Sequence, residues 1–227
     1  MKFVTVILFL FVNFNIVLSQ DKTRVVSFNA SINGEKLQLD HNYAFGSDSI
    51  SFSNLKFYIS DFKFYRDEEF IGSIAKKNHL IDFSQPTTQY ILLDSISNVH
   101  YNRIEFNLGT DSLDNVSGAM SDDLDPIYGM YWTWQSGYIN FKLEGSSKVC
   151  PSRNHEFNFH IGGYLYPFIS MQRLVFEVNQ SSDLSFNLDL SKLISIHHLQ
   201  KEYNIMSPSE KSLLFSKRIV DCINLSK

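Results

Sequence analysis

The side chains best suited to unusual chemistry lie between Pro126 and Tyr138. This run holds both tryptophans of the chain, Trp132 and Trp134, one residue apart, with Met130 just before them. If the run is a β-strand, both indoles project on one face, because side chains at i and i+2 share a face. Two indoles beside a thioether predict either an aromatic core, with Met130 as an adaptable filler, or a pocket with an unusual chemical role.

Imidazole ligands for any metal ion would have to come from histidines that the sequence does not group. The chain contains seven: His41, His79, His100, His155, His160, His197 and His198. No HxH or HExxH motif and no closely spaced His/Cys set occurs among them. Local spacing alone therefore predicts no metal site, since a lone histidine is more often structural or solvent-facing.

Several separated blocks of the chain, taken together, resemble the MbnP-type copper-binding proteins, which are secreted bacterial β-proteins. The resemblance runs from about Val26 to about Leu193. It is strongest in LDPIYGMYWTWQSGYINFKLEG and FHIGG and weaker in KFYISDFKFY and HLIDF. Membership of this family would imply copper binding, in some members through a tryptophan oxidised to kynurenine beside histidines.

The resemblance singles out four residues for the metal. His160 stands in FHIGG and His79 in HLIDF, and both are expected to be imidazole ligands, with Trp132 or Trp134 beside the ion. His155 lies five residues before His160, hence on the opposite face of a regular strand. An unmodified indole N–H only donates, so a ligating tryptophan implies a tryptophan-modifying oxidase as partner. The alternative is that both indoles are core aromatics.

The two cysteines, Cys150 and Cys222, have no CxxC spacing. In an exported protein, two such distant cysteines can form a disulfide that closes a long loop. We therefore expect a Cys150–Cys222 disulfide that pins the C-terminal helical segment, with two buried free thiols as the alternative.

The segment from about Gly109 to Tyr128 is long and acidic. Its aspartates are Asp111, Asp114, Asp122, Asp123 and Asp125. They offer the oxygen ligands that calcium prefers, but without the spacing of the helix–loop–helix calcium motif. Turn aspartates that cap backbone amides are the alternative explanation.

Alternating apolar and polar residues dominate the remaining sequence. Strands are expected at 25–30, 37–39, 50–53, 55–65, 79–83, 89–93, 99–107, 138–144, 155–162, 172–178 and 184–189. Many short strands with turn signals such as Asn33-Gly34 predict an all-β fold, an antiparallel β-sandwich with a long acidic loop. A short C-terminal helical segment is expected over Ser209–Ile219, and residues 20–227 are expected to form one domain.

Residues 1–19 have the pattern of a secretory signal peptide, with Lys2 before a nearly continuous apolar run. The net charge of −4 offers no electrostatic case for nucleic acid, and no later stretch is apolar enough for stable membrane insertion. We therefore expect a periplasmic or secreted protein.

These patterns favour an exported copper-binding protein that serves copper acquisition, storage or delivery outside the cytoplasm. The alternative is a metal-free β-sandwich interaction module that binds a carbohydrate or protein partner through the aromatic run. Because no Gly-x-Ser-x-Gly elbow, P-loop or dinucleotide motif occurs, we do not expect an enzyme. The copper hypothesis requires His160 and one indole to share a face of the sandwich.

Overall fold

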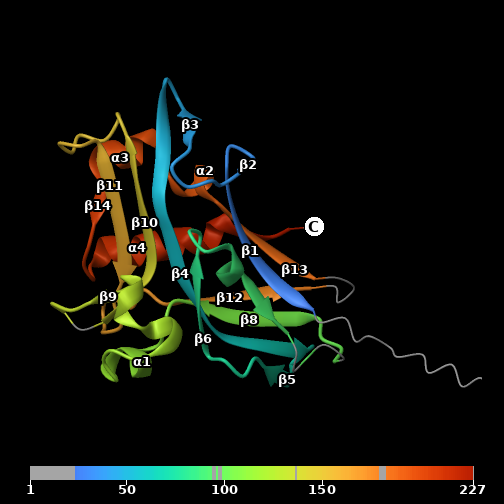
Figure 1. Ribbon diagram of the computed structural model, residues 1–227. Coiled ribbons are helices and arrows are strands. Elements are labelled where there is room, and N and C mark those ends of the chain that lie inside the picture. Colours follow the sequence, from blue (N-terminus) through green and yellow to red (C-terminus); the bar gives the residue numbers. More distant parts are fainter. Residues whose placement is uncertain (1–23, 94–95, 97–98, 136, 179–182, 227) are drawn as a thin grey trace, which may run out of the picture.

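The computed structural model describes residues 24–93, 96, 99–135, 137–178 and 183–226, and its strands form two sheets (Figure 1). The small sheet contains β1 (Val25–Ile32), β2 (Glu35–Lys36), β7 (Tyr90–Leu92), β13 (Leu184–Asp189) and β15 (Ile223–Leu225). The large sheet contains β3 (Asn42–Phe45), β4 (Asp48–Arg66), β5 (Glu69–Ser73), β6 (Asn78–Asp82), β8 (Arg103–Leu108), β9 (Tyr131–Trp132), β10 (Gly137–Ser147), β11 (Glu156–Gly162), β12 (Gln172–Glu177) and β14 (Asn204–Ile205). The expected signal peptide lies outside the described residues.

The large sheet is organised around β4, whose 19 residues pair with five other strands. Its main order is β12-β8-β4-β10-β11-β14, while β3, β5 and β6 also pair with β4. Most pairs in both sheets are antiparallel, as predicted. In the small sheet, however, β1 pairs with β13 in parallel from Val26↔Leu184 to Ser31↔Asp189, which joins two segments far apart in the sequence.

Aromatic rings fill the space between the two sheets. Phe28 of β1 lies with its ring centroid 6.1 Å from that of Phe57 on β4 and 5.8 Å from that of Phe106 on β8. All three side chains belong to one continuous core with the inward residues of β10 and β11. The sheet face that points into this core is called the inner face below, and the opposite face the outer face. The predicted β-sandwich is confirmed.

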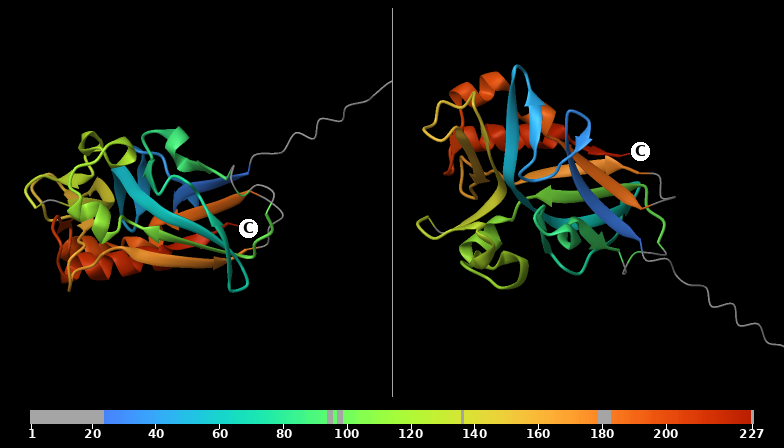
Figure 2. Two further views of the ribbon diagram at one scale, coloured as in Figure 1. Left: turned by 90° about the horizontal axis from the view of Figure 1, so that it is seen from below. Right: turned by 45° about the horizontal axis from the view of Figure 1, so that its top comes forward.

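Short helices complete the inner side. They are α2 (Leu190–Leu193), α3 (Ile196–Lys201) and α4 (Glu210–Cys222). Phe215 of α4 stacks on Phe159 of β11 at 4.7 Å, so α4 covers a part of the large sheet that the small sheet does not reach (Figure 2). The Ser209 side chain accepts a hydrogen bond from the Ser212 N–H and begins α4, close to the predicted start. No helix in the described chain is long and apolar enough to span a bilayer.

The acidic segment is folded rather than open. It contains the helix α1 (Ser112–Val116) and the 3-10 turns η3 (Asp122–Leu124) and η4 (Pro126–Tyr128), with a further turn, η1 (Pro86–Gln89), elsewhere. This segment and β9 pack on the outer face of the large sheet and form a second apolar cluster, in which Met130 and Tyr58 are fully buried. Both faces of the sheet are therefore covered around Tyr58 of β4.

The predicted disulfide is not formed in the structure. Cys150, just after β10, and Cys222, at the end of α4, are both free, buried thiols within the main core. Burial raises the pKa of each thiol to about 11. The alternative of two buried thiols therefore describes them, because each cysteine packs as a small apolar core residue.

Candidate metal-binding face

Strand β11 places His160 on the outer face of the large sheet. Phe157, Phe159 and Ile161 alternate into the main core. Since successive side chains of a strand project to opposite faces, His160 and Gly162 point outward. Only 7% of the surface of His160 is exposed, so the imidazole is almost enclosed.

The His160 imidazole is held by a carboxylate on the adjacent strand. Its Nε2 lies 2.7 Å from Glu144 Oε1, while the other carboxylate oxygen of Glu144 accepts a hydrogen bond from the Asn54 side-chain amide at 2.9 Å. Among the described residues, His160 Nδ1 has no hydrogen-bond partner. This arrangement fixes the ring and leaves one nitrogen for another ligand.

Electrostatics stabilise the charged form of this carboxylate. The hydrogen bond from His160 lowers the pKa of Glu144 from 4.5 to about 2, against the opposing effect of burial. Asn54 and Lys142 add to the lowering. Glu144 is therefore an anion throughout the neutral pH range.

A row of charged side chains crosses four strands beside this pair. Asp82 of β6 faces Lys56 of β4, Lys56 faces Lys142 of β10, and Lys142 faces His160 of β11. Lys56 Nζ donates to the Tyr128 carbonyl at 3.2 Å and Lys142 Nζ to the carbonyl of the following glycine at 3.3 Å. The two lysines thus hold the segment that carries the tryptophans onto the sheet.

The tryptophans lie on the same face as His160. A Cβ built on Gly162 would come within 2.6 Å of Trp132 Cζ3, so the Trp132 indole lies directly over this glycine, two residues from His160. Trp132 is buried, whereas Trp134 is 65% exposed, and their ring centroids are 5.9 Å apart. Only Trp132 lies within β9. The alternative that both indoles are core aromatics therefore fits Trp132 and does not fit Trp134.

His79 lies on the other face. It pairs with Ile59 of β4, and Ile59 and Ile81 both belong to the main core. His79 Nε2 is 3.0 Å from the Lys76 carbonyl oxygen, and burial lowers the pKa of this histidine. The structure therefore places His160 and Trp132 on one face, with Trp134 beside Trp132, and it places His79 on the other face.

Sequence reasoning missed Glu144 and Lys142 as members of this face. Both stand in the KLEG run, two residues apart, and alternation alone places them on one side of a strand. The pairing partner of that strand was not visible in the sequence, so no local signal connected Glu144 with His160.

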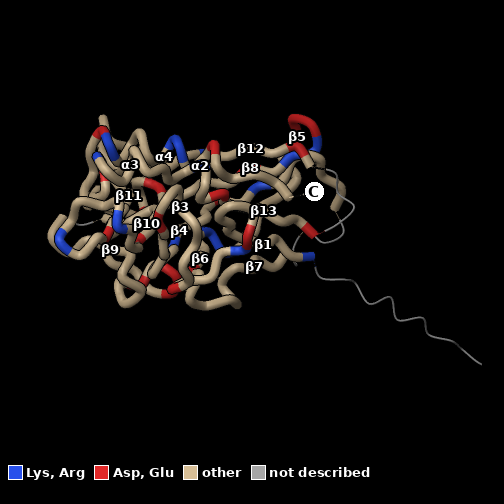
Figure 3. The backbone as a smooth tube through the Cα atoms, turned by 90° about the horizontal axis from the view of Figure 1, so that it is seen from above, with Lys and Arg blue, Asp and Glu red and all other residues tan. Residues whose placement is uncertain are grey.

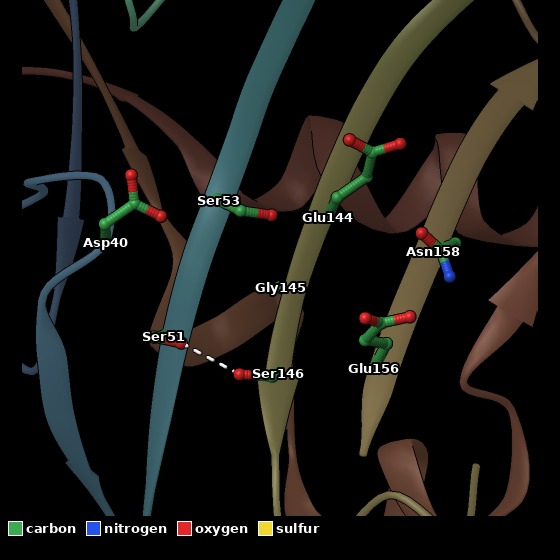
Figure 4. Close-up of a pocket in the computed structure, with 8 residues that line it drawn as sticks. All are labelled: Asp40, Ser51, Ser53, Glu144, Gly145, Ser146, Glu156 and Asn158. Atoms are coloured by element: carbon green, nitrogen blue, oxygen red, sulfur yellow. Dashed lines mark hydrogen bonds between the residues drawn. The ribbon is translucent and has the colours of Figure 1, made fainter. Parts of the chain in front are cut away.

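A polar hollow of about 390 Å³ adjoins Glu144 (Figure 4). Three carboxylates surround it, Glu144 on β10, Glu156 on β11 and Asp40 beyond β4. In the described part of the chain, no three His, Cys, Asp or Glu side chains come close enough together to hold a metal ion. The outer face thus supplies one supported imidazole rather than a complete set of ligands.

The carboxylates of the acidic segment are largely taken up by lysines and backbone amides. Lys77 Nζ lies 2.7 Å from Asp111 and 3.0 Å from Asp114, and Lys76 Nζ lies 2.7 Å from Asp123. Asp111 and Asp125 also cap α1 and η4. These contacts match the capping explanation, and calcium binding here stays an untested prediction.

Over the described chain as a whole, basic and acidic residues are interspersed (Figure 3).

Comparison with known proteins gives two results. The family model described as MbnP matches residues 22–208. Among solved structures, MbnP from Methylosinus trichosporium is similar with a TM-score of 0.58 and 17% identity, over 76% of this chain and 77% of that one. At this identity, the likeness concerns the fold. No curated protein matches the sequence.

Proposed function

Because this chain belongs to the MbnP family, we propose that it is an exported protein that binds copper and serves its acquisition, storage or delivery outside the cytoplasm. The observation that carries the proposal is the 2.7 Å contact between Glu144 and His160 on the face that also holds Trp132. Metal-binding histidines commonly donate their second N–H to a carboxylate in this way.

In this proposal, His160 binds copper through Nδ1, and Glu144 is a positioning residue. A carboxylate at Nε2 selects the tautomer whose proton is on Nε2, so the Nδ1 lone pair is available to a metal. The enclosed surroundings suit a soft cation such as copper(I), which takes imidazole and thioether ligands rather than water.

A tryptophan-modifying oxidase is the partner that would add a ligand. The unmodified indole N–H cannot bind a metal through nitrogen. With dioxygen as the oxidant, both oxygen atoms add across the indole C2–C3 bond, which is cleaved to give N-formylkynurenine. Hydrolysis by one water then releases formate and leaves the aryl amine and ketone of kynurenine. Trp134 is the more accessible substrate because it is 65% exposed. Peptide mapping of residues 130–142 from native cells would detect this change.

A copper(I) titration of the untagged mature protein against a chromophoric chelator tests the proposal. We expect His160→Ala to weaken copper(I) binding by at least about 10- to 100-fold, the loss typical when only the supporting partner of a metal ligand is removed. His79→Ala is the matched control and should leave the affinity unchanged, because His79 faces the inner side. Binding weaker than micromolar in the parent protein, or equal losses in both variants, would refute the proposed site.

A second candidate is a metal-free interaction module with the same fold. It is favoured by the lack of a three-ligand group among the described side chains and by the exposure of Trp134. Function resides in sites rather than folds, so a family member can keep the sandwich without the metal. Absence of copper from protein isolated from copper-supplemented cells would support this second candidate.

A further inference from the structure

A second pocket lies beyond the end of β11, on a loop that the copper proposal does not use, and the aromatic run contributes only Gln135 to the described lining. It has a volume of about 310 Å³. Its walls include Gln135, Tyr164, Leu165, Tyr166, Phe168 and Pro208. Three separate segments thus meet at this pocket: the turn after Trp134, the loop of residues 163–168, and the approach to α4.

The loop is held in a fixed shape before any ligand arrives. Gly163 has φ +129°, and a Cβ there would lie 2.3 Å from the Phe168 carbonyl oxygen, so only glycine permits this close approach. The Gly163 carbonyl accepts the Ser170 N–H at 3.0 Å, and the Leu165 carbonyl accepts the Phe168 N–H at 2.9 Å. A preformed pocket binds its ligand without the cost of ordering a loop.

The chemistry of the walls selects a class of ligand. None of the described residues that line the pocket carries a formal charge. Tyr166 is 89% and Leu165 64% exposed, although burial of such side chains is favourable. Aromatic rings with polar tips, beside the Gln135 amide, suit a ligand with a flat C–H face and a rim of hydroxyl groups.

We propose that this pocket binds an uncharged sugar of one or two pyranose rings, stacked on Tyr164 or Tyr166 and hydrogen-bonded by Gln135. The absence of charged lining residues argues against sugar acids and amino sugars, whose charges would be left without a partner. A proline-rich peptide needs an extended aromatic groove, whereas this pocket is compact. The proposal does not depend on copper.

Saturation-transfer NMR on the mature protein tests the proposal, with maltose, cellobiose, lactose and N,N′-diacetylchitobiose as neutral probes and glucuronate and glucosamine as charged comparators. We expect at least one neutral sugar to bind with a Kd on the order of 1 mM, a modest affinity for a ligand of this size. The charged comparators should bind at least 5-fold more weakly.

Three variants locate the binding. Tyr166→Ala and Gln135→Ala should each weaken sugar binding at least 5-fold without changing the melting temperature, since both side chains are exposed. Tyr90→Ala removes another exposed tyrosine, on β7 and outside the pocket lining, and should have no effect. His160→Ala should also leave sugar binding intact, which separates this proposal from the copper site. No binding by any neutral sugar, binding that Tyr166→Ala does not change, or preference for a proline-rich peptide would overturn it.

Discussion

The inner face of the large sheet packs against one continuous aromatic core, whereas its outer face is divided between a small apolar cluster and a row of charges. The inner face is closed by the small sheet and α4. The outer face is covered by the acidic segment and the tryptophan run, which lysines hold in place. Residues that could bind a ligand therefore gather on the outer face, where packing leaves polar groups accessible.

The two predicted histidines illustrate this difference. Both were selected by resemblance to the same family, yet His160 points outward to Glu144 and His79 points to the inner side. Because side chains alternate along a strand, the register of each strand decides the face that a residue reaches. The following predictions test whether the two faces differ in this way.

The largest effect is expected for Gly162→Ala. The added Cβ would lie 2.6 Å from both Trp132 Cζ3 and the Tyr138 carbonyl oxygen, so the indole and the backbone of β10 must move. Overpacking of this kind costs about 3 kcal/mol of unfolding free energy. Urea unfolding measures the loss, and a red shift of tryptophan emission reports the exposure of Trp132.

Gly72→Ala on β5 is the matched control, since a Cβ there meets nothing within 4 Å. It should change the unfolding free energy by less than about 0.5 kcal/mol. Equal effects of the two substitutions would show that Trp132 does not close the outer face over β11.

A smaller effect is expected for Glu144→Gln, which keeps the shape but removes the charge beside His160. The folded-state pKa of Glu144 is lowered from 4.5 to about 2, so its contribution is complete above pH 4.5 and is lost as the pH falls towards 2. We expect a loss of about 1–2 kcal/mol at pH 6, typical of a hydrogen bond to a charged group.

The pH dependence distinguishes this contact from a general effect of charge. Between pH 4.5 and 2, the difference in stability between the parent and Glu144→Gln should shrink towards zero. Glu156→Gln removes an exposed carboxylate from the neighbouring strand and should leave the profile unchanged. An undiminished difference at pH 2 would contradict the assignment of this stability to the charged Glu144 carboxylate.

The smallest effect on stability is expected from reducing conditions, because both cysteines are free on the inner side. Burial raises the pKa of each thiol to about 11, so neither should react with iodoacetamide at pH 8 in the native protein. Both should react after unfolding without reductant. If the unfolded, unreduced protein is not alkylated and its intact mass is two hydrogens lower than that of the reduced chain, the Cys150–Cys222 disulfide is present in solution.

Local patterns predicted a large part of this fold. The alternation in β1 and β13 and the helical segment expected over Ser209–Ile219 indicated elements that the structure contains. The parallel β1/β13 pair was not predictable, because its strands are separated by about 150 residues and the partner of a strand is decided by tertiary packing. The shape of the acidic segment depended similarly on its contacts with Lys76 and Lys77.

The sequence by itself determined the family, the β-rich architecture and the location of both tryptophans in one short run. It also selected His160 as a candidate imidazole ligand. The tertiary structure decided which of these residues meet, because strand register and pairing place side chains from distant segments on a common face. It brought Glu144 beside His160, laid Trp132 over Gly162, directed His79 to the opposite face and left the two cysteines as separate buried thiols.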